Sequence, residues 1–575
     1  MIAVVVLSVM LVFALAYRLY GRFLSRQFQL DDERPTPAVQ FNDGVDYVPA
    51  KPSLLLGQHF SAIAAAGPIV GPILAGICYG WLPALLWIVV GAIFIGGLHD
   101  FASLVASIRH KAASIGEVVR ANMSRTSHVL FLLFVWLCLI YVIIAFTDVT
   151  AQTFRTVSGG DAYGPAVAAS SILYLLAGVA MGLLLYKARV KLWLATVIFV
   201  PGVLFIVWLG PNLPASLLGA LSAVSTKQWD ALLLVYCFVA SLVPMWLLLQ
   251  PRGYLGGWLL YLVVAVGLVG AMSGRFAIRA EAVVSQEPNG LFGGLLPMMP
   301  FLFITVACGA CSGFHAIVST GTTSKQLAKE TDARRIGYGA MLLEGLVAVL
   351  ALATVMMLSP QELTAGRKGA PNMIYAEGIA RYLGLLGLDY RLAMGFALLA
   401  FSTFVYATLD VATRLGRYIF QELLGLKGRW GGLAATAATL SLPLAFLMLI
   451  QREQAWRVAW NIFGASNQLL ASLTLLAISL WLASTGRRVY YAVIPMVFMM
   501  AMSLWSLALQ CWPFWKGLVF GGLVSDTVIV GIAAMLLLAL SVWLIAEAAR
   551  VLLHPKIARQ APGREAIPRD TMLSR

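Results

Sequence analysis

Charged residues are scarce in this sequence. Only 11% of its 575 residues are Asp, Glu, Lys or Arg, whereas 61% are hydrophobic. A soluble domain usually has about 25% charged residues, so this scarcity excludes an ordinary soluble protein. Apolar runs of roughly 20 residues recur along the chain, and each is long enough to cross a bilayer as a helix. We therefore predict an all-α polytopic membrane protein with about 15 transmembrane helices.

Catalytic motifs and a disulfide framework are also missing. The sequence has no GxxxxGK[ST], HExxH or GxSxG motif, so we predict neither enzyme activity nor a cofactor. The cysteines all fall inside predicted spans and do not indicate extracellular disulfides. They are Cys78, Cys138, Cys237, Cys308, Cys311 and Cys511.

The basic residues indicate how the chain is oriented. The formal charge of +15 is better interpreted as a topology signal than as a nucleic-acid surface, because most Lys and Arg fall in alternate loops. Cytoplasmic loops are enriched in basic residues, which places the N-terminus in the periplasm and the C-terminus in the cytoplasm of a bacterial inner membrane. The first span is expected to be retained and not cleaved as a signal peptide. The predicted spans are 1–20, 57–79, 81–108, 127–150, 164–186, 191–213, 228–249, 254–273, 294–320, 336–358, 391–413, 432–451, 460–484, 489–511 and 524–549.

One apolar span contains residues that interrupt a helix. In "GQHFSAIAAAGPIVGPILAG", residues 57–76, Gly67, Pro68, Gly71 and Pro72 lie near the middle. Proline removes a backbone donor and clashes with the preceding turn. Such a break is tolerated in a membrane where it lines a polar cavity. We therefore predict that the freed backbone of Ala64, Ala65 and Ala66, with Gly67, Pro68 and Gly71, contacts the substrate or a coupling ion.

A second interruption is expected at Pro244–Arg252, in the first span of a second group of five helices. An odd number of helices in each group inverts the second group relative to the first, as in transporters with five-plus-five inverted repeats. The predicted parts are a peripheral helix and cytoplasmic loop (1–56), repeat one (57–213), repeat two (228–424), accessory helices (425–549) and a cytoplasmic tail (550–575).

Three stretches closely resemble the carbon starvation protein A family of bacterial inner-membrane transporters. They are residues 41–75, 306–342 and 408–422, the last reading "TLDVATRLGRYIFQE". The resemblance implies peptide or pyruvate uptake linked to carbon limitation, the latter with protons. It also implies the fold of the amino acid–polyamine–organocation transporters. The family often has a small non-cysteine residue where this chain has Cys311, which argues against a family-wide metal role there.

Ionisable side chains within spans are rare and are candidates for function. Asp100, beside His99, is the predicted proton carrier, because a buried carboxyl can hold a proton near neutral pH. His59 and His315 are expected near it on the cytoplasmic side. Further candidates for substrate binding, coupling or gating are Asp148, Glu344, Asp410 and Arg414. The last two, one helical turn apart, can equally form a structural pair.

Residues 308–320 allow two interpretations. Cys308, Cys311 and His315 share one helix face, but a structural zinc site needs four ligands, so we predict no metal. The hydroxyls of Ser312, Ser319 and Thr320 are more useful, because Na⁺ or a polar substrate can bind such groups together with freed carbonyls.

The leading functional hypothesis is a secondary transporter for uptake of pyruvate or short peptides, coupled to H⁺ or, alternatively, to Na⁺. A small carboxylate suits the positive end of a half-helix that begins near Gly67. The alternatives are a nutrient-sensing receptor and a Na⁺-coupled transporter of another small carboxylate or amino acid. The expected partners are the small-molecule substrate and membrane lipid, without nucleic acid; the sequence does not predict the oligomeric state.

Overall fold

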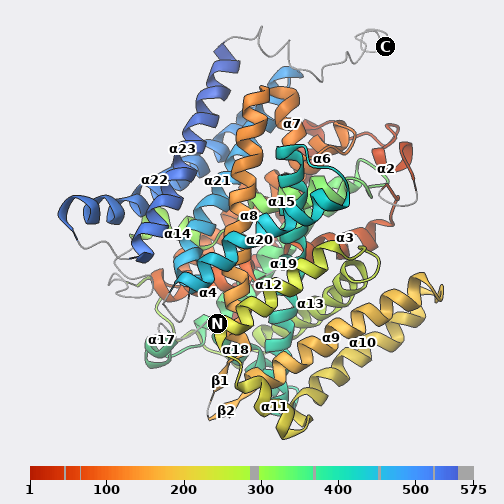
Figure 1. Cartoon of the computed structure of the whole chain (residues 1–575), viewed down its shortest axis with the longest axis vertical. Coiled ribbons are helices and arrows are strands. Elements are labelled where there is room, and N and C mark those ends of the chain that lie inside the picture. Colours follow the sequence, from red (N-terminus) through yellow and green to blue (C-terminus); the bar gives the residue numbers. More distant parts are fainter. Residues whose placement is uncertain are drawn as a thin grey trace.

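The computed structural model describes residues 1–43, 47–64, 66–158, 160–284, 297–366, 371–450, 455–521 and 525–553. These residues form a bundle of helices with one small two-stranded hairpin (Figure 1). The strands, β1(Val157–Ser158) and β2(Asp161–Ala162), pair antiparallel in a short loop between two long helices. The predicted all-α membrane fold is confirmed.

The helices occupy most of the apolar runs that the sequence contains. In the first half of the chain they are α1(Ile2–Gln27), α2(Pro37–Gln40), α3(Pro52–Ile63), α4(Gly67–Tyr79), α5(Trp81–Val90), η1(Gly91–Gly96), α6(Gly97–Arg109), α7(Ile115–Asn122), α8(Arg125–Thr153), α9(Tyr163–Tyr186), α10(Leu192–Leu209), η2(Gly210–Asn212), α11(Ala215–Ser222), α12(Thr226–Leu242) and α13(Leu249–Met272). In the second half they are α14(Met298–Thr305), α15(Gly313–Val318), η3(Ser319–Thr323), η4(Arg334–Tyr338), α16(Gly339–Met356), α17(Pro360–Gly366), α18(Pro371–Gly384), α19(Tyr390–Leu424), α20(Gly428–Leu449), α21(Ala455–Ser484), α22(Tyr490–Phe520) and α23(Ser525–Leu553).

Within the described residues, 12 helices are long and apolar enough to cross a membrane, or 13 if the bent pair α3 and α4 forms one span. The shortfall from the predicted number has two sources. Helix α12 has only 17 residues, and the predicted span 294–320 is divided between the short helices α14 and α15. These segments are therefore too short, as continuous helices, to be counted as complete spans.

The first predicted interruption is present. Helix α3 ends at Ile63, α4 begins at Gly67, and the two are bent by 48°. Pro68 lies in the first turn of α4, where its missing N–H costs no helical hydrogen bond. Ala64 caps α3 with non-helical backbone angles. The local sequence thus ends one helix and starts another within the apolar run.

The second predicted interruption is misplaced. Pro244 does not break a span; it lies in the connection between α12 and α13, which are separate helices. Pro244 does mark a change in the backbone, because α12 ends at Leu242, just before it. A break inside an apolar run occurs instead between α14 and α15, where residues 306–312 are not helical. Two interrupted segments therefore exist, but the second is at 306–312.

The interior of the bundle includes a helix from the C-terminal part of the chain. Every residue in the most apolar window of α21 is buried, whereas only 22% of that window is buried in α1 and 17% in α10. The sequence predicts accessory helices over 425–549, yet α21 packs against α8 and α15 at the centre. The repeat boundaries and their relation by inversion stay a prediction.

Candidate functional site

The two interrupted segments pack directly against each other. A Cβ added to Gly67 lies 2.4 Å from Cys308 Sγ, and one added to Gly71 lies 2.5 Å from the carbonyl oxygen of Thr305. Both distances are shorter than any stable contact, so a side chain at Gly67 would have to displace the Cys308 side chain, and one at Gly71 the backbone at Thr305. The predicted break at Gly67 and the unpredicted break at 306–312 therefore form one central region.

Two amide side chains of α21 bind backbone and hydroxyl groups in the second break and in the helices that flank it. Asn467 Oδ1 accepts hydrogen bonds from Phe314 N (3.0 Å) and Ser312 Oγ (3.3 Å). Gln468 Nε2 donates to the carbonyl of Phe303 at 3.1 Å. Unpaired backbone groups are costly in a membrane, so these amides stabilise the interruption. Neither residue was predicted as functional; the available signal is two adjacent amides within an otherwise apolar span.

A continuous buried polar network lies beside these breaks. Asp100 on α6 uses both carboxylate oxygens: Oδ1 is 2.8 Å from His99 Nδ1, and Oδ2 is 2.8 Å from His315 Nδ1. On its other side, His315 Nε2 lies 3.2 Å from Glu344 Oε2 on α16, at an angle that misses hydrogen-bond geometry. All four side chains are completely buried. The structure thus brings together the predicted candidates Asp100, His315 and Glu344.

His59 joins the same region from the broken helix α3. Its Nδ1 is 2.9 Å from Thr323 Oγ1, while its Nε2 has no hydrogen-bond partner. His59 and Thr323 link α3 to η3, directly after the helix that carries His315. The sequence predicts His59 near Asp100 and His315, and its contact with η3 is consistent with that placement.

The predicted hydroxyl candidates have different surroundings. Ser312 is bonded to Asn467, and Thr320 Oγ1 accepts a hydrogen bond from Ile115 N at 3.2 Å. Ser319 Oγ is buried without a partner. Ala64 and Ala66 flank the first break, whereas Ala65 lies outside the described residues. Their roles in binding an ion or substrate stay predictions.

Asp148 lies apart from the His315 network. Its Oδ2 accepts a hydrogen bond from Trp456 N at 2.8 Å, at the start of α21. A carboxylate at a helix N-terminus satisfies a free backbone donor and favours the helix dipole. This contact gives Asp148 a structural partner, and its predicted part in substrate binding stays a prediction.

Asp410 and Arg414 are not paired in the way that their spacing suggests. Asp410 forms its ion pair with Arg252 of α13. Arg414 Nη2 instead donates to the carbonyls of Ala240 (2.9 Å) and Val243 (2.8 Å), at the C-terminal end of α12. The expected i,i+4 pair is therefore replaced by two contacts between helices.

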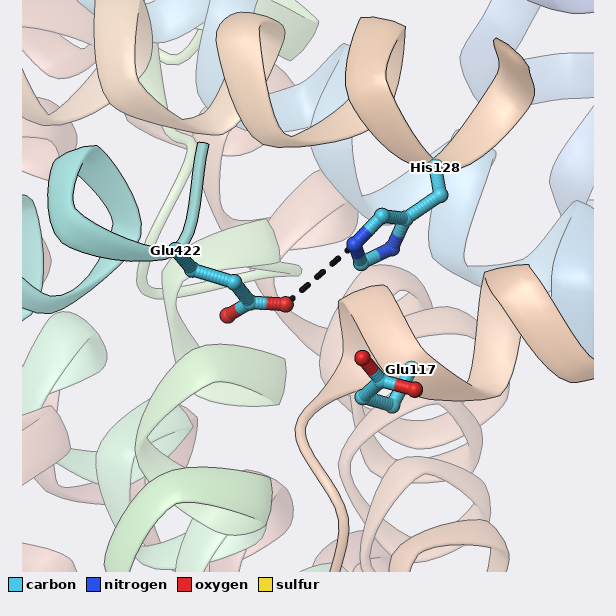
Figure 2. A group of neighbouring side chains, drawn as sticks. All are labelled: Glu117, His128 and Glu422. Carbon is cyan, nitrogen blue, oxygen red and sulfur yellow. Dashed lines mark ion pairs between the residues drawn. The ribbon is translucent and has the colours of Figure 1, made fainter. Parts of the chain in front are cut away.

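A separate group of possible metal ligands lies where α7, α8 and α19 meet. Figure 2 shows His128 facing Glu422, with Glu117 beside them. His128 Nε2 is 3.3 Å from Glu422 Oε1, and its Nδ1 lies 3.0 Å from the Gly116 carbonyl. Among the described residues this is the only set of three with ligand atoms within 4.8 Å of one another. Since Glu117 also pairs with Arg120, ion pairs account for the group, and the absence of a metal stays a prediction.

The sequence of the chain matches a known protein family. Residues 1–366 and 361–506 match the family described as "Carbon starvation protein CstA". This chain belongs to the CstA family. CstA-family membership and the apolar helices together make it a multi-pass membrane protein.

Several CstA-family relatives align over most of their length. The peptide transporter CstA of Bacillus subtilis (strain 168) is 32% identical over 86% of this chain and 88% of its own. The pyruvate/proton symporter BtsT of Escherichia coli (strain K12) is 30% identical over 88% of this chain and 81% of its own. A solved manganese transporter from Eremococcus coleocola covers 88% of this chain and 99% of its own, at 14% identity and a TM-score of 0.39. That likeness is too distant to carry an argument.

Proposed function

We propose that this chain is a secondary active transporter that takes up pyruvate or short peptides with protons across the bacterial inner membrane. The relatives are named as peptide transporters and as a pyruvate/proton symporter, which supports this substrate class and coupling ion. The observation that carries the proposal is the buried His99–Asp100–His315–Glu344 network beside the two interrupted segments.

The network has the chemistry needed to carry a proton. His315 lies between two carboxylates, one on each side of its ring. A charge buried in a membrane is costly, so a change in protonation here alters which arrangement of the helices is most stable. Asp100 belongs to α6 and Glu344 to α16. His315, on α15, lies between their two carboxylates and contacts both. Proton binding can therefore be coupled to movement of the interrupted helix α14–α15.

The freed backbone near Ala64 and Ala66 is the proposed region of substrate contact. It adjoins the N-terminus of α4, a helix of 13 residues whose positive dipole end faces the break. With the N-terminus periplasmic, the network would lie toward the cytoplasm, where a proton can leave as the inner gate opens.

Uptake into proteoliposomes tests the proposal. Purified full-length protein is reconstituted and offered labelled pyruvate or a labelled dipeptide, with an imposed ΔpH or a Na⁺ gradient. We expect ΔpH to drive accumulation of at least one substrate above equilibrium. Accumulation that follows only Na⁺ would assign coupling to another ion. Binding without accumulation under either gradient would favour a nutrient receptor.

A further inference from the structure

A second buried charged group lies among α9, α12, α13 and α19. Arg252 is 1% exposed and forms an ion pair with Asp410, which is 2% exposed. Tyr236 accepts a hydrogen bond from Arg252 Nη1 and donates one to Asp410 Oδ2 at 3.0 Å. Tyr174 donates to the backbone carbonyl of Arg252 at 2.7 Å. We call these four residues, with Tyr406, the Arg252 cluster.

Only one of the three guanidinium nitrogens of Arg252 takes part in these contacts. Both the Tyr236 and the Asp410 contact are made by Nη1. Its Nε and Nη2 atoms are buried and have no hydrogen-bond partner, and Asp410 Oδ1 is likewise unpartnered. An unpaired donor in such surroundings is costly. Because Nε and Nη2 lie on one edge of the planar group, they form a fork that matches the two oxygens of a carboxylate.

The surroundings of the fork also favour an anion. The Tyr406 ring lies 6.0 Å from the Arg252 guanidinium carbon, which keeps the cation against an aromatic surface. Arg414 follows Asp410 by one helical turn, so two guanidinium groups accompany one carboxylate. The carbonyls at the end of α12 offset part of the Arg414 charge. A formal excess of positive charge remains, and an anionic ligand would balance it.

We infer that Arg252 is a carboxylate-binding residue, whose Nε and Nη2 hold the carboxylate of a small ligand. The identity of the ligand, pyruvate or the C-terminus of a short peptide, rests on the proposed function. The site is distinct from the Asp100 network. The first turn of α4 packs against Cys308 and the Thr305 carbonyl, so the break beside it would contact a part of the substrate other than the carboxylate. The non-helical connection at 243–248 precedes Arg252 closely and provides a place for α12 and α13 to move apart.

If the Arg252–Asp410 pair only stabilised the fold, its replacement would have a different effect on ligand binding. A pair that only stabilises the fold can often be replaced by apolar residues of similar size without loss. A binding site cannot be replaced in this way, because the ligand loses its partner. The double variant Arg252→Met/Asp410→Leu therefore separates the two roles, because it removes both charges of the pair while Arg414 keeps its two carbonyl partners.

Equilibrium binding to the full chain in detergent tests the inference. The probes are labelled pyruvate and labelled dialanine, with their amides as competitors that lack the carboxylate. We compare the wild type, Arg252→Lys and the double variant. Arg391→Lys is the matched control, since Arg391 lies on the same helix as Asp410 but in an exposed ion pair with Asp161. Thermal unfolding shows which variants are folded.

We expect the wild type and Arg391→Lys to bind one probe, and the amides not to compete. Arg252→Lys keeps the charge but loses the fork, so its affinity should fall at least about tenfold, and the double variant should not bind. Wild-type-like binding by either folded variant, or no binding of either probe by the wild type, would overturn the inference. If Arg252→Lys does not fold, the double variant decides. Because binding needs no gradient, failure here is distinguishable from failure of ΔpH-driven uptake.

Discussion

At the scale of single residues, Gly67 and Cys308 determine how closely the two interrupted segments approach. The contact lies between α4 and non-helical backbone, and any side chain at position 67 must displace the Cys308 thiol. The sequence predicts that the backbone at Gly67 contacts the substrate or a coupling ion. The structure shows a packing requirement at the same residue, which leads to a sharper test.

Gly67→Ala should reduce uptake several-fold while the protein stays folded, and Gly67→Leu should abolish it, because the added atoms separate the two breaks. Uptake into proteoliposomes measures the effect. Cys308→Gly removes the atoms that the new Cβ meets, so Gly67→Ala/Cys308→Gly should regain much of the uptake. Unchanged uptake by Gly67→Ala, or no recovery in the double variant, would refute this account of the contact.

At the scale of elements, the sequence indicates the broken helices unevenly. The first break carries Pro and Gly at its site, and the structure has it there. The second break, at 306–312, has no proline, and polar groups in it and beside it are bonded to Asn467 and Gln468 from a distant helix. Pro244, which predicted a break within a span, instead follows the end of helix α12. Local sequence therefore predicts an interruption caused by local residues, but not one stabilised by tertiary contacts.

Helix α17 illustrates a capping motif that the sequence alone could reveal. Glu362 accepts a hydrogen bond from Ser359 N at 2.7 Å, Glu362 N donates to Ser359 Oγ, and Arg381 of α18 pairs with the carboxylate. The hydrogen bond from the Ser359 backbone and then the hydrogen bond from Arg381 lower the pKa of Glu362 to about 2. Because the pKa of Glu362 is lower in the folded state, its ionised carboxylate stabilises the fold at any pH above its pKa in the unfolded chain. This stabilisation is lost as the pH falls through the pKa of the folded state.

Glu362→Gln should therefore unfold at a slightly lower temperature than the wild type above about pH 5. The difference should narrow as pH falls toward about 2, where the wild-type carboxyl also becomes neutral. Thermal unfolding in detergent across this range measures it, and Arg381→Gln should show a similar trend. A difference that stays constant with pH would show that charge at Glu362 does not contribute.

At the scale of the whole molecule, loops predicted on one side of the membrane contact each other. Arg109 pairs with Glu330 at 2.6 Å and Arg487 binds the Phe28 carbonyl, all in predicted cytoplasmic segments. Asp161, in a predicted periplasmic loop, pairs with Arg391 at the periplasmic end of the predicted span 391–413. Figure 1 shows β1, β2, α11 and α17 at one end of the bundle and α2, α6 and α7 toward the other. These contacts agree with the two sides predicted from the charge pattern, which does not indicate which helices are central.

Introduced cysteines test which side is which. The six native cysteines are buried, so Ser222→Cys and Arg189→Cys each provide one exposed thiol. We expect a membrane-impermeant maleimide to label Ser222→Cys in intact cells whose outer membrane is permeabilised, and Arg189→Cys only after lysis. The reverse pattern would show that the orientation is inverted.

The site could be predicted from sequence only in part, because its members come from distant segments. Asp100, His315 and Glu344 were recognisable as ionisable residues in apolar spans. Their chain of contacts, the pairing of Asp410 with Arg252 and the part played by α21 depend on packing that no local pattern encodes. Buried polar groups mark candidates, and only the tertiary fold assigns their partners.

Asp100→Asn shows whether Asp100 carries the coupled proton, through a comparison of ΔpH-driven accumulation with substrate exchange. Asparagine keeps the size of Asp100 and imitates its protonated form, but it cannot release a proton. We predict that reconstituted Asp100→Asn exchanges labelled for unlabelled substrate at a rate near that of the wild type, yet fails to concentrate substrate under an imposed ΔpH. Concentration of substrate against a gradient by Asp100→Asn, driven by ΔpH as in the wild type, would contradict the account.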